Sequence, residues 1–275
     1  MNLNDLVNNY LSLGYEIADA QSKVCQDLIL YKIGKSKYAH NITVKGGVVM
    51  HNISKSTRRA TRDLDLDFIK YSLDDNSIIK FINELNAKDK EILIKFNDKI
   101  EKLHHQLYDG KRVNISITDN YNNCLETKLD IGVHKYKYFE LEQDEYIFDF
   151  DIFDGSVSLL INSPEQIVCE KLKSLLKFGI RSTRYKDIFD LYYFINNDIL
   201  KKDKLLKYID LLIIKDENIN QNTINEIIVR LETILNNRRF ISRLDNARSN
   251  WINKPVNDVI SRVILYFESL ETFQA

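Results

Sequence analysis

The sequence predicts an α+β fold with two domains. The N-terminal domain, residues 1–162, is expected to carry a mixed or antiparallel sheet flanked by helices, and the C-terminal domain, residues 163–275, is expected to be helical. Up to about residue 162, segments with helical spacing of apolar residues are mixed with segments in which apolar and polar residues alternate; beyond it, helical spacing dominates. A chain of 275 residues is long enough for two such domains.

Helices in the N-terminal part are predicted where apolar residues recur every three or four positions: 3–11, 17–31, 48–53 and 76–87. Strands are predicted at 42–44, 63–68, 92–96, 113–117, 127–131, 147–153 and 157–161. Asp109-Gly110 and Asp154-Gly155 are hairpin signals, each between two extended stretches. A polar and basic loop over 55–62 precedes the strand 63–68.

The C-terminal part opens with Ser163-Pro164, which provides an N-cap and a proline at the first helical position. Helices are predicted at 164–178, 184–196, 203–214 and 221–237, with one or more to the end. Cys169 lies among apolar residues of the first of these helices and is expected in the core.

Composition excludes several classes of function. Lys and Arg number 39 against 40 Asp and Glu, which excludes a globally basic nucleic-acid binder but not a local basic face. The longest apolar runs, such as 211–214, are far shorter than the ~20 residues that span a bilayer. The 3 cysteines are scattered, which argues against a disulfide framework and a structural zinc. We expect a cytoplasmic protein that does not enter the membrane.

Three aspartates at alternate positions, Asp63, Asp65 and Asp67, are the most informative feature. Strand geometry places them on one face, with neighbours ~6.6 Å apart, and the apolar residues between them on the buried face. Like charges repel, so something positive should compensate. A divalent metal such as Mg²⁺, which prefers carboxylate and phosphate oxygens, would do so. The alternative is an ordinary solvated strand face.

Other features could belong to the same site. Lys45-Gly46-Gly47 lies between a predicted strand and helix, where glycines allow close backbone approach and a helix N-terminus attracts phosphate. Alone, it is also compatible with an ordinary turn. Asp130 is flanked by apolar residues in a predicted strand, so it could supply a third carboxylate or simply face outward.

The helical half contains a basic tract. Between 171 and 207 there are ten Lys and Arg and four Asp and Glu, and Asp187 and Asp190 share a helix face at i,i+3 spacing. The tract could hold a triphosphate or a nucleic-acid backbone, or be a solvated helix face. No GxSxG, HExxH or P-loop motif is present in the sequence.

Taken in order, these motifs resemble a known family. The segments VKGGVVM (44–50) and RATRDLD (59–65) look like the strand–GG–helix–R-x-[ST]-x-D-[IL]-D signature of the AbiEii/AbiGii nucleotidyltransferase toxins, within the DNA polymerase β-like nucleotidyltransferase superfamily. EKL (170–172) and RYKDIFDL (184–191) resemble its later motifs, and the match covers roughly 20–195. Many superfamily members have Gly-Ser where this chain has Gly46-Gly47, so backbone amides would have to hold the phosphate here.

The resemblance implies a metal site. Asp63 and Asp65 would hold one or two Mg²⁺ ions on the triphosphate of an NTP, and Asp130 would complete the second metal site and help to activate the acceptor hydroxyl. Asp67 would support this group or be merely solvated.

The resemblance also implies residues that bind the nucleotide. Lys171 would contact the phosphates as a point charge, and Asp187 would orient that lysine or serve the acceptor. Gly46 and Gly47 would bind the nucleotide through their backbone, and Arg59 would steady the loop or the leaving pyrophosphate.

The family's members are toxins of bacterial toxin–antitoxin and phage-defence (abortive infection) systems, each paired with a separately encoded antitoxin. The resemblance therefore implies Mg²⁺-dependent transfer of NMP from an NTP, with pyrophosphate released and tRNA or another RNA as a candidate acceptor. Two alternatives stay open: a transferase of the same fold that acts on a small molecule or protein, and a non-catalytic nucleotide-binding regulatory module.

Overall fold

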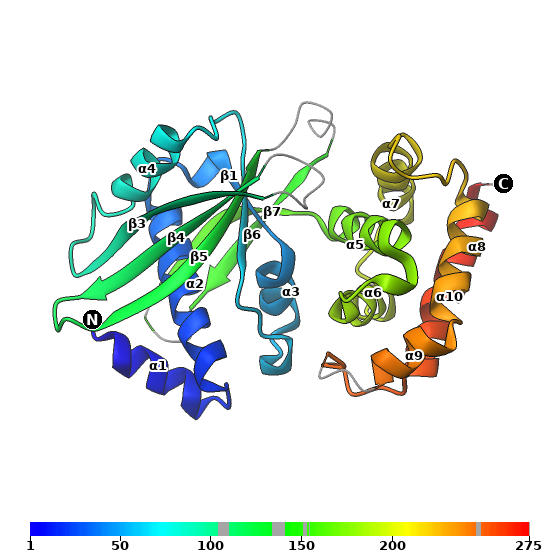
Figure 1. Ribbon diagram of the computed structural model, residues 1–275, viewed down its shortest axis with the longest axis horizontal. Coiled ribbons are helices and arrows are strands. Elements are labelled where there is room, and N and C mark those ends of the chain that lie inside the picture. The colour runs from blue at the N-terminus through cyan, green and yellow to red at the C-terminus, as the bar shows by residue number, and fades with distance from the viewer. Residues whose placement is uncertain (104–109, 134–140, 151–152, 154, 246–248, 275) are drawn as a thin grey trace. The chain divides into compact units, whose positions relative to one another are not determined.

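The computed structural model describes residues 1–103, 110–133, 141–150, 153, 155–245 and 249–274. The chain divides into two compact units, Met1–Asn162 and Ser163–Ala275. The predicted α+β class is confirmed, because the described part of the first unit holds a mixed seven-stranded sheet flanked by helices and that of the second holds helices (Figure 1).

The sheet places two short strands at its centre. Its strands are β1 (Ile42–Lys45), β2 (Leu64–Phe68), β3 (Ile92–Leu103), β4 (Gly110–Asp119), β5 (Cys124–Val133), β6 (Gln143–Asp149) and β7 (Ser156–Asn162). Their order is β3-β4-β5-β2-β1-β7-β6. The pairs β2–β5 and β1–β7 are parallel, and the other pairs are antiparallel.

Helices bury one face of the central strands. The helices described in the first unit are α1 (Leu3–Ser12), α2 (Ile17–Lys35), α3 (Gly46–Ser54) and α4 (Asp75–Glu84). Helix α2 contacts β5 and β7, and α4 contacts β3. Phe81 of α4 meets Phe68 of β2 with ring centres 5.3 Å apart, and Leu64 and Leu66 are buried on the same strand. The apolar half of the predicted strand 63–68 therefore faces the core, as expected.

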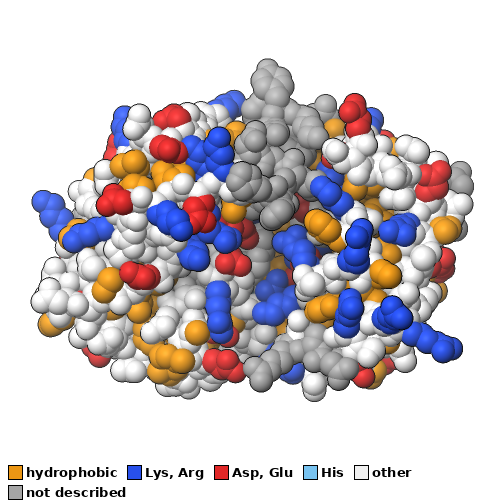
Figure 2. Space-filling view, in the orientation of Figure 1, with side chains coloured by type: hydrophobic (Ala, Val, Ile, Leu, Met, Phe, Trp, Pro, Cys, Tyr) orange, Lys and Arg blue, Asp and Glu red, His pale blue; other side chains and the backbone are white. Residues whose placement is uncertain are grey.

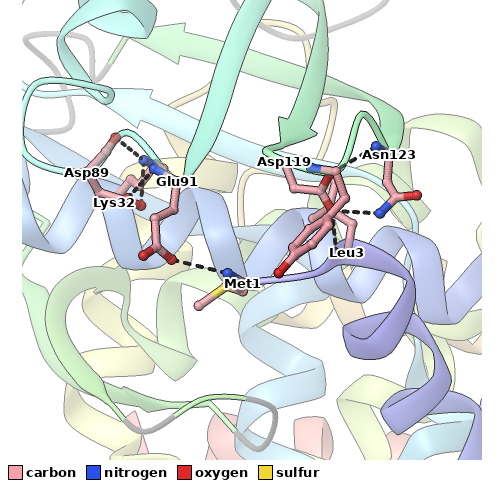
Figure 3. A network of polar contacts seen from close by, with 8 residues as sticks. Met1, Leu3, Lys32, Asp89, Glu91, Asp119 and Asn123 are labelled. Carbon is pink, nitrogen blue, oxygen red and sulfur yellow. Dashed lines mark hydrogen bonds and ion pairs between the residues drawn. The ribbon is translucent and has the colours of Figure 1, made fainter.

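Side chains of the first unit tie its N-terminus to the sheet (Figure 3). The Leu3 N–H donates to Asp119 Oδ2 at 2.8 Å, and the Asn123 N–H donates to Asp119 Oδ1 at 2.9 Å. Burial would raise the pKa of Asp119, but these and neighbouring hydrogen bonds lower it to about 2. The terminal ammonium of Met1 lies 3.1 Å from Glu91 Oε2. Asp119 thus fixes the β4–β5 turn and the start of α1 together.

The second unit is built from helices throughout its described part. They are α5 (Pro164–Phe178), α6 (Tyr185–Asn196), α7 (Lys202–Ile209), α8 (Ile224–Leu235), α9 (Arg238–Asp245) and α10 (Val256–Gln274). A 3-10 turn, Gly179–Arg181, follows α5. Ser163 Oγ accepts from the Gln166 N–H at 3.4 Å, so the predicted cap is present. Cys169 is fully buried, as expected.

The structure corrects some predicted boundaries. Asp63 lies just before β2 rather than within it. Strand β3 continues well past 96, because a bulge between Phe96 and Ile100 interrupts the alternation without ending the pairing. Helix α8 begins only at 224, after Thr223 caps the Glu226 N–H. The hairpin residues Asp109 and Asp154 lie outside the described residues.

Candidate active site

A row of four charged residues crosses the centre of the sheet. Lys45 of β1 is opposite Asp65 of β2, Asp65 is opposite Asp130 of β5, and Asp130 is opposite Arg112 of β4. Residues at the same level of neighbouring strands project from the same face of a sheet. The row therefore sets two carboxylates side by side with a cation at each end, on the face opposite to Leu64.

Lys45 neutralises the third aspartate of the sequence motif. Its Nζ lies 2.7 Å from Asp67 Oδ1, and both side chains are buried. Asp67 is two residues along β2 from Asp65, so this ion pair runs diagonally between the two strands. The expectation of a solvated strand face is therefore wrong for Asp67, because a buried charge needs a partner and has one.

Arg112 holds Asp130 through two parallel hydrogen bonds. Its Nε donates to Oδ1 and its Nη2 donates to Oδ2, both at 2.7 Å. The hydrogen bond to Asp130 raises the pKa of Arg112, and the negative charge of Asp63 adds to the effect. Asp130 is buried, so the outward-facing alternative is wrong. Asp63, Asp130 and Arg112 thus share one electrostatic environment.

The two glycines allow other side chains to approach the start of α3. Strand β1 ends at Lys45 and α3 begins at Gly46, so the helix starts at the glycines themselves and not at the predicted residue 48. Gly46 has a φ of 71°, and a Cβ atom there would lie 2.3 Å from Asp65 Oδ2. A Cβ atom at Gly47 would lie 2.7 Å from Thr61 Oγ1. The glycines therefore let Asp65 and Thr61 pack directly against the first turn of the helix.

Two residues of α2 anchor the loop before the acidic strand. Gln26 Nε2 donates to the Thr61 carbonyl at 2.8 Å, and Arg62 Nε lies 2.7 Å from Asp19 Oδ1. Arg59, expected to steady this loop or the pyrophosphate, is buried. These contacts hold the loop in place, while Lys55, Arg58 and Arg62 remain exposed.

His51 of α3 fixes the start of the same loop. Its Nδ1 is 3.0 Å from the Ser56 carbonyl oxygen, and its Nε2 is 2.9 Å from the Tyr15 hydroxyl. A carbonyl oxygen only accepts, so Nδ1 carries the proton and the neutral Nε2 accepts from Tyr15. Burial, together with the positive charge of Lys23, lowers the pKa of His51 to about 4.

The fit of a metal ion depends on which carboxylates are accessible. Among the described residues, no group of three His, Cys, Asp or Glu side chains is arranged to hold a metal. Asp63 is exposed and Asp65 is half-buried, whereas Asp130 is buried and lies 2.7 Å from Arg112. Mg²⁺ typically uses one or two protein carboxylates together with phosphate oxygens and water. Asp63 and Asp65 fit one such ion.

A second charged cluster lies within the helical unit. Lys171 Nζ is 2.6 Å from Asp187 Oδ1 and 2.8 Å from Asp190 Oδ2. Trp251 Nε1 donates to the other oxygen of Asp190 at 3.0 Å, and Arg184 Nε lies 3.6 Å from Asp187 Oδ2. The lysine and the aspartate singled out from the sequence therefore meet, and Asp190 holds the lysine from a second side.

The structure divides the basic tract 171–207. Lys173, two residues after Lys171, forms a separate buried ion pair with Asp216. Burial would raise the pKa of Asp216, but hydrogen bonds from Lys173 and Asn218 hold it below its usual range. Two of the ten cations of the tract are thus internal, so the tract is not one continuous basic surface.

Sequence reasoning did not assign several partners that complete these clusters. Lys45 was visible before the two glycines, but only the strand register brings it beside Asp67. Arg112 precedes the alternating segment 113–117, and its pairing with Asp130 follows from the β4–β5 register. Trp251 is 61 positions from Asp190 along the chain, and no local pattern connects them.

Comparison with known proteins defines the class. A family model described as "Nucleotidyl transferase AbiEii toxin, Type IV TA system" matches residues 28–251, a range that contains every candidate site residue named above. The protein is therefore of the nucleotidyltransferase class. It belongs to the AbiEii toxin family of type IV toxin–antitoxin systems, which implies an NTP substrate and an antitoxin partner. A search of curated proteins found no match to the chain.

The part of the chain that the structure describes contains no helix with the length and apolar character needed to cross a membrane.

The buried histidine predicts a pH dependence of stability. The folded pKa of His51, about 4, lies below the ordinary value of about 6.5, so the unfolded chain binds the extra proton between these values. This contribution is full above pH 6.5 and is lost as the pH falls toward 4. We expect His51 alone to lower the free energy of unfolding by about 3 kcal/mol between pH 7 and pH 4.

Urea denaturation at a series of pH values measures the slope of the free energy of unfolding against pH. His51→Gln should flatten it, whereas His40→Gln, at an exposed position, should keep the slope of the unsubstituted protein. An unchanged slope in His51→Gln would show that His51 is not held neutral by its surroundings.

Proposed function

We propose that the protein transfers NMP from an NTP to an acceptor hydroxyl, with pyrophosphate released and Mg²⁺ required. The observation that carries this proposal is the placement of Asp65 against the Gly46 turn, with Asp63 beside it and Asp130 on the next strand. Phosphate groups are favoured at a helix N-terminus, and a divalent cation is favoured between carboxylates and phosphates. The start of α3 and the carboxylates at the start of β2 would together suit a bound triphosphate.

Asp63 and Asp65 are proposed as the metal ligands. Mg²⁺ held there would neutralise charge on the phosphates. Asp130 is kept in position by Arg112 and would help to activate the acceptor hydroxyl. Its participation in a second metal site would require that Arg112 release it. Asp67, paired with Lys45, would stabilise β2 next to the proposed metal ligands.

Gly46 and Gly47 would bind the nucleotide through backbone N–H groups, since neither offers a side chain. Arg59, buried in the anchored loop, would steady that loop close to Asp63. Lys171 would contact the phosphates, and Asp187 would orient the lysine, which its 2.6 Å contact supports. Charge-assisted contacts of this kind are among the stronger hydrogen bonds in proteins.

The acceptor that we propose is RNA, with tRNA as the first candidate. In this function the protein acts in the cytoplasm as the toxin of a phage-defence system, where its activity would arrest growth by modifying an RNA. A separately encoded antitoxin would relieve that arrest.

Replacing either metal-binding aspartate tests the proposed chemistry. Asp63→Asn and Asp65→Asn keep the shape of the side chain but remove its charge, so we expect transfer to fall about 100-fold or more. The measurement is incubation with each α-labelled NTP, Mg²⁺ and total RNA, followed by separation of the labelled products. Growth inhibition in cells should be lost in parallel.

Asp5→Asn, on the exposed first turn of α1, is the matched control and should retain full transfer. Thermal melting checks that the variants fold. If both site variants transfer label as well as the control does, the metal assignment is wrong. Label in a small molecule or in protein rather than RNA would contradict the proposed acceptor alone.

The two buried lysines of α5 provide a second test. Lys171→Met should weaken binding of a non-hydrolysable NTP about 10- to 100-fold, because a charge-assisted contact to phosphate is lost. Lys173→Met removes an equally buried lysine that pairs with Asp216, so it should lower stability without changing NTP affinity. Titration calorimetry with Mg²⁺ measures both.

Melting temperature and NTP affinity together distinguish a loss of stability from a loss of nucleotide binding. Both variants are expected to melt at lower temperature, since each leaves buried carboxylate without its cation. Equal NTP affinities in Lys171→Met and Lys173→Met would remove Lys171 from the nucleotide site.

A further inference from the structure

The turn after α5 exposes apolar side chains. Phe178, the last residue of α5, is 45% exposed, and Ile180 in the turn Gly179–Arg181 is 43% exposed. Isolated exposed apolar residues are common on protein surfaces and carry little meaning by themselves. These two differ because three cationic side chains lie against the same turn.

Cations from three elements surround this turn. A Cβ atom at Gly179 would lie 2.8 Å from Arg230 Nη2, so the guanidinium of this α8 residue rests on the turn. Arg243 of α9 donates from Nη1 to the Ile180 carbonyl at 3.4 Å. Lys177 Nζ lies 5.9 Å from the centre of the Phe178 ring. Phe240 of α9 also packs on Tyr185 of α6, so α6 lies next to this group.

Among the residues that the structure describes, these cations have no acidic partner. Within the described residues, none of four exposed side chains forms an ion pair: Lys177, Arg181, Arg230 and Arg243. The acidic residues of α6, Asp187 and Asp190, form ion pairs with Lys171. In the view of Figure 2, Lys and Arg side chains gather over α6 and α9. The surface therefore has a strong positive charge, which attracts anionic ligands.

We propose that this arginine surface, formed by Lys177, Phe178, Ile180, Arg181, Arg230 and Arg243, binds the acceptor RNA. Guanidinium groups bind phosphate oxygens in a fixed, two-pronged geometry, and an exposed aromatic ring stacks on unpaired bases. An acidic protein would also be attracted by the positive charges, but it has no bases to stack on the Phe178 ring.

Arg184, three positions after Arg181 of the arginine surface, contacts the Lys171 cluster. Arg184, exposed at the start of α6, contacts Asp187 at 3.6 Å and donates from Nη1 to Ser174 Oγ at 3.3 Å. RNA on the arginine surface would therefore border the pair of residues to which the proposed function gives nucleotide and acceptor roles. The inference rests on that function for the identity of the RNA as acceptor, but the binding itself does not require it.

Fluorescence anisotropy with a labelled tRNA and no NTP tests the surface. The combined variant Arg181→Ala, Arg230→Ala and Arg243→Ala should lose roughly 30-fold or more in affinity, and the slope of log K against log salt should become shallower by about 2. Phe178→Ala should lower affinity about 5- to 100-fold and leave that slope unchanged.

The control removes three exposed lysines elsewhere in the same unit, Lys201, Lys207 and Lys254, by substitution with Ala. It should bind tRNA nearly as the unsubstituted protein does. Equal losses in both triple variants would overturn the proposal, since binding would then follow net charge and not this surface. Binding of polyglutamate with no affinity for tRNA would overturn it in favour of a protein partner.

The outcomes distinguish this inference from the proposed function. If the arginine variant loses tRNA binding but no label ever reaches RNA, the surface stands and the proposed acceptor fails. If the unsubstituted protein labels RNA and the arginine variant binds and labels it equally well, the function stands and the surface is wrong.

Discussion

The neutralisation of carboxylates at the centre of a sheet is the constraint on which the first unit depends. Asp65, Asp67 and Asp130 lie on two adjacent strands, where like charges would repel and burial would add to the cost. Lys45 and Arg112, on the outer neighbours of these strands, supply the opposite charges. Asp67 is paired with Lys45 and Asp130 with Arg112 inside the protein, whereas Asp63 is exposed just before β2, so the N-terminal end of the acidic motif is where we propose that Mg²⁺ binds.

The helical unit also buries charged side chains, but there the acidic residues outnumber the basic one. One buried lysine lies between two aspartates, so Lys171 with Asp187 and Asp190 carries a net negative charge that Arg184 approaches from the surface. Two carboxylates fix the position of the ammonium group, and the indole of Trp251 fixes one of the carboxylates. Such a lysine has little conformational freedom to lose when it meets a phosphate.

The sequence was informative where the signal is local. Alternation identified the buried side of β2, the two glycines marked the step from β1 to α3, and the Ser163-Pro164 cap located α5. It was uninformative where partners come from distant strands: the diagonal pair Lys45–Asp67 and the pair Arg112–Asp130 depend on strand order and register, which no short motif encodes. Counting charges also misjudged the tract 171–207, because burial of Lys173 cannot be read from composition.

Direct observation of a metal ion is the sharpest test of the account. Crystals grown with Mn²⁺ and a non-hydrolysable NTP would reveal the ion by its anomalous scattering. We predict a peak coordinated by Asp63 and Asp65 and by phosphate oxygens of a nucleotide that lies over the Gly46 turn. A nucleotide bound elsewhere, or an ion without contact to either aspartate, would contradict it.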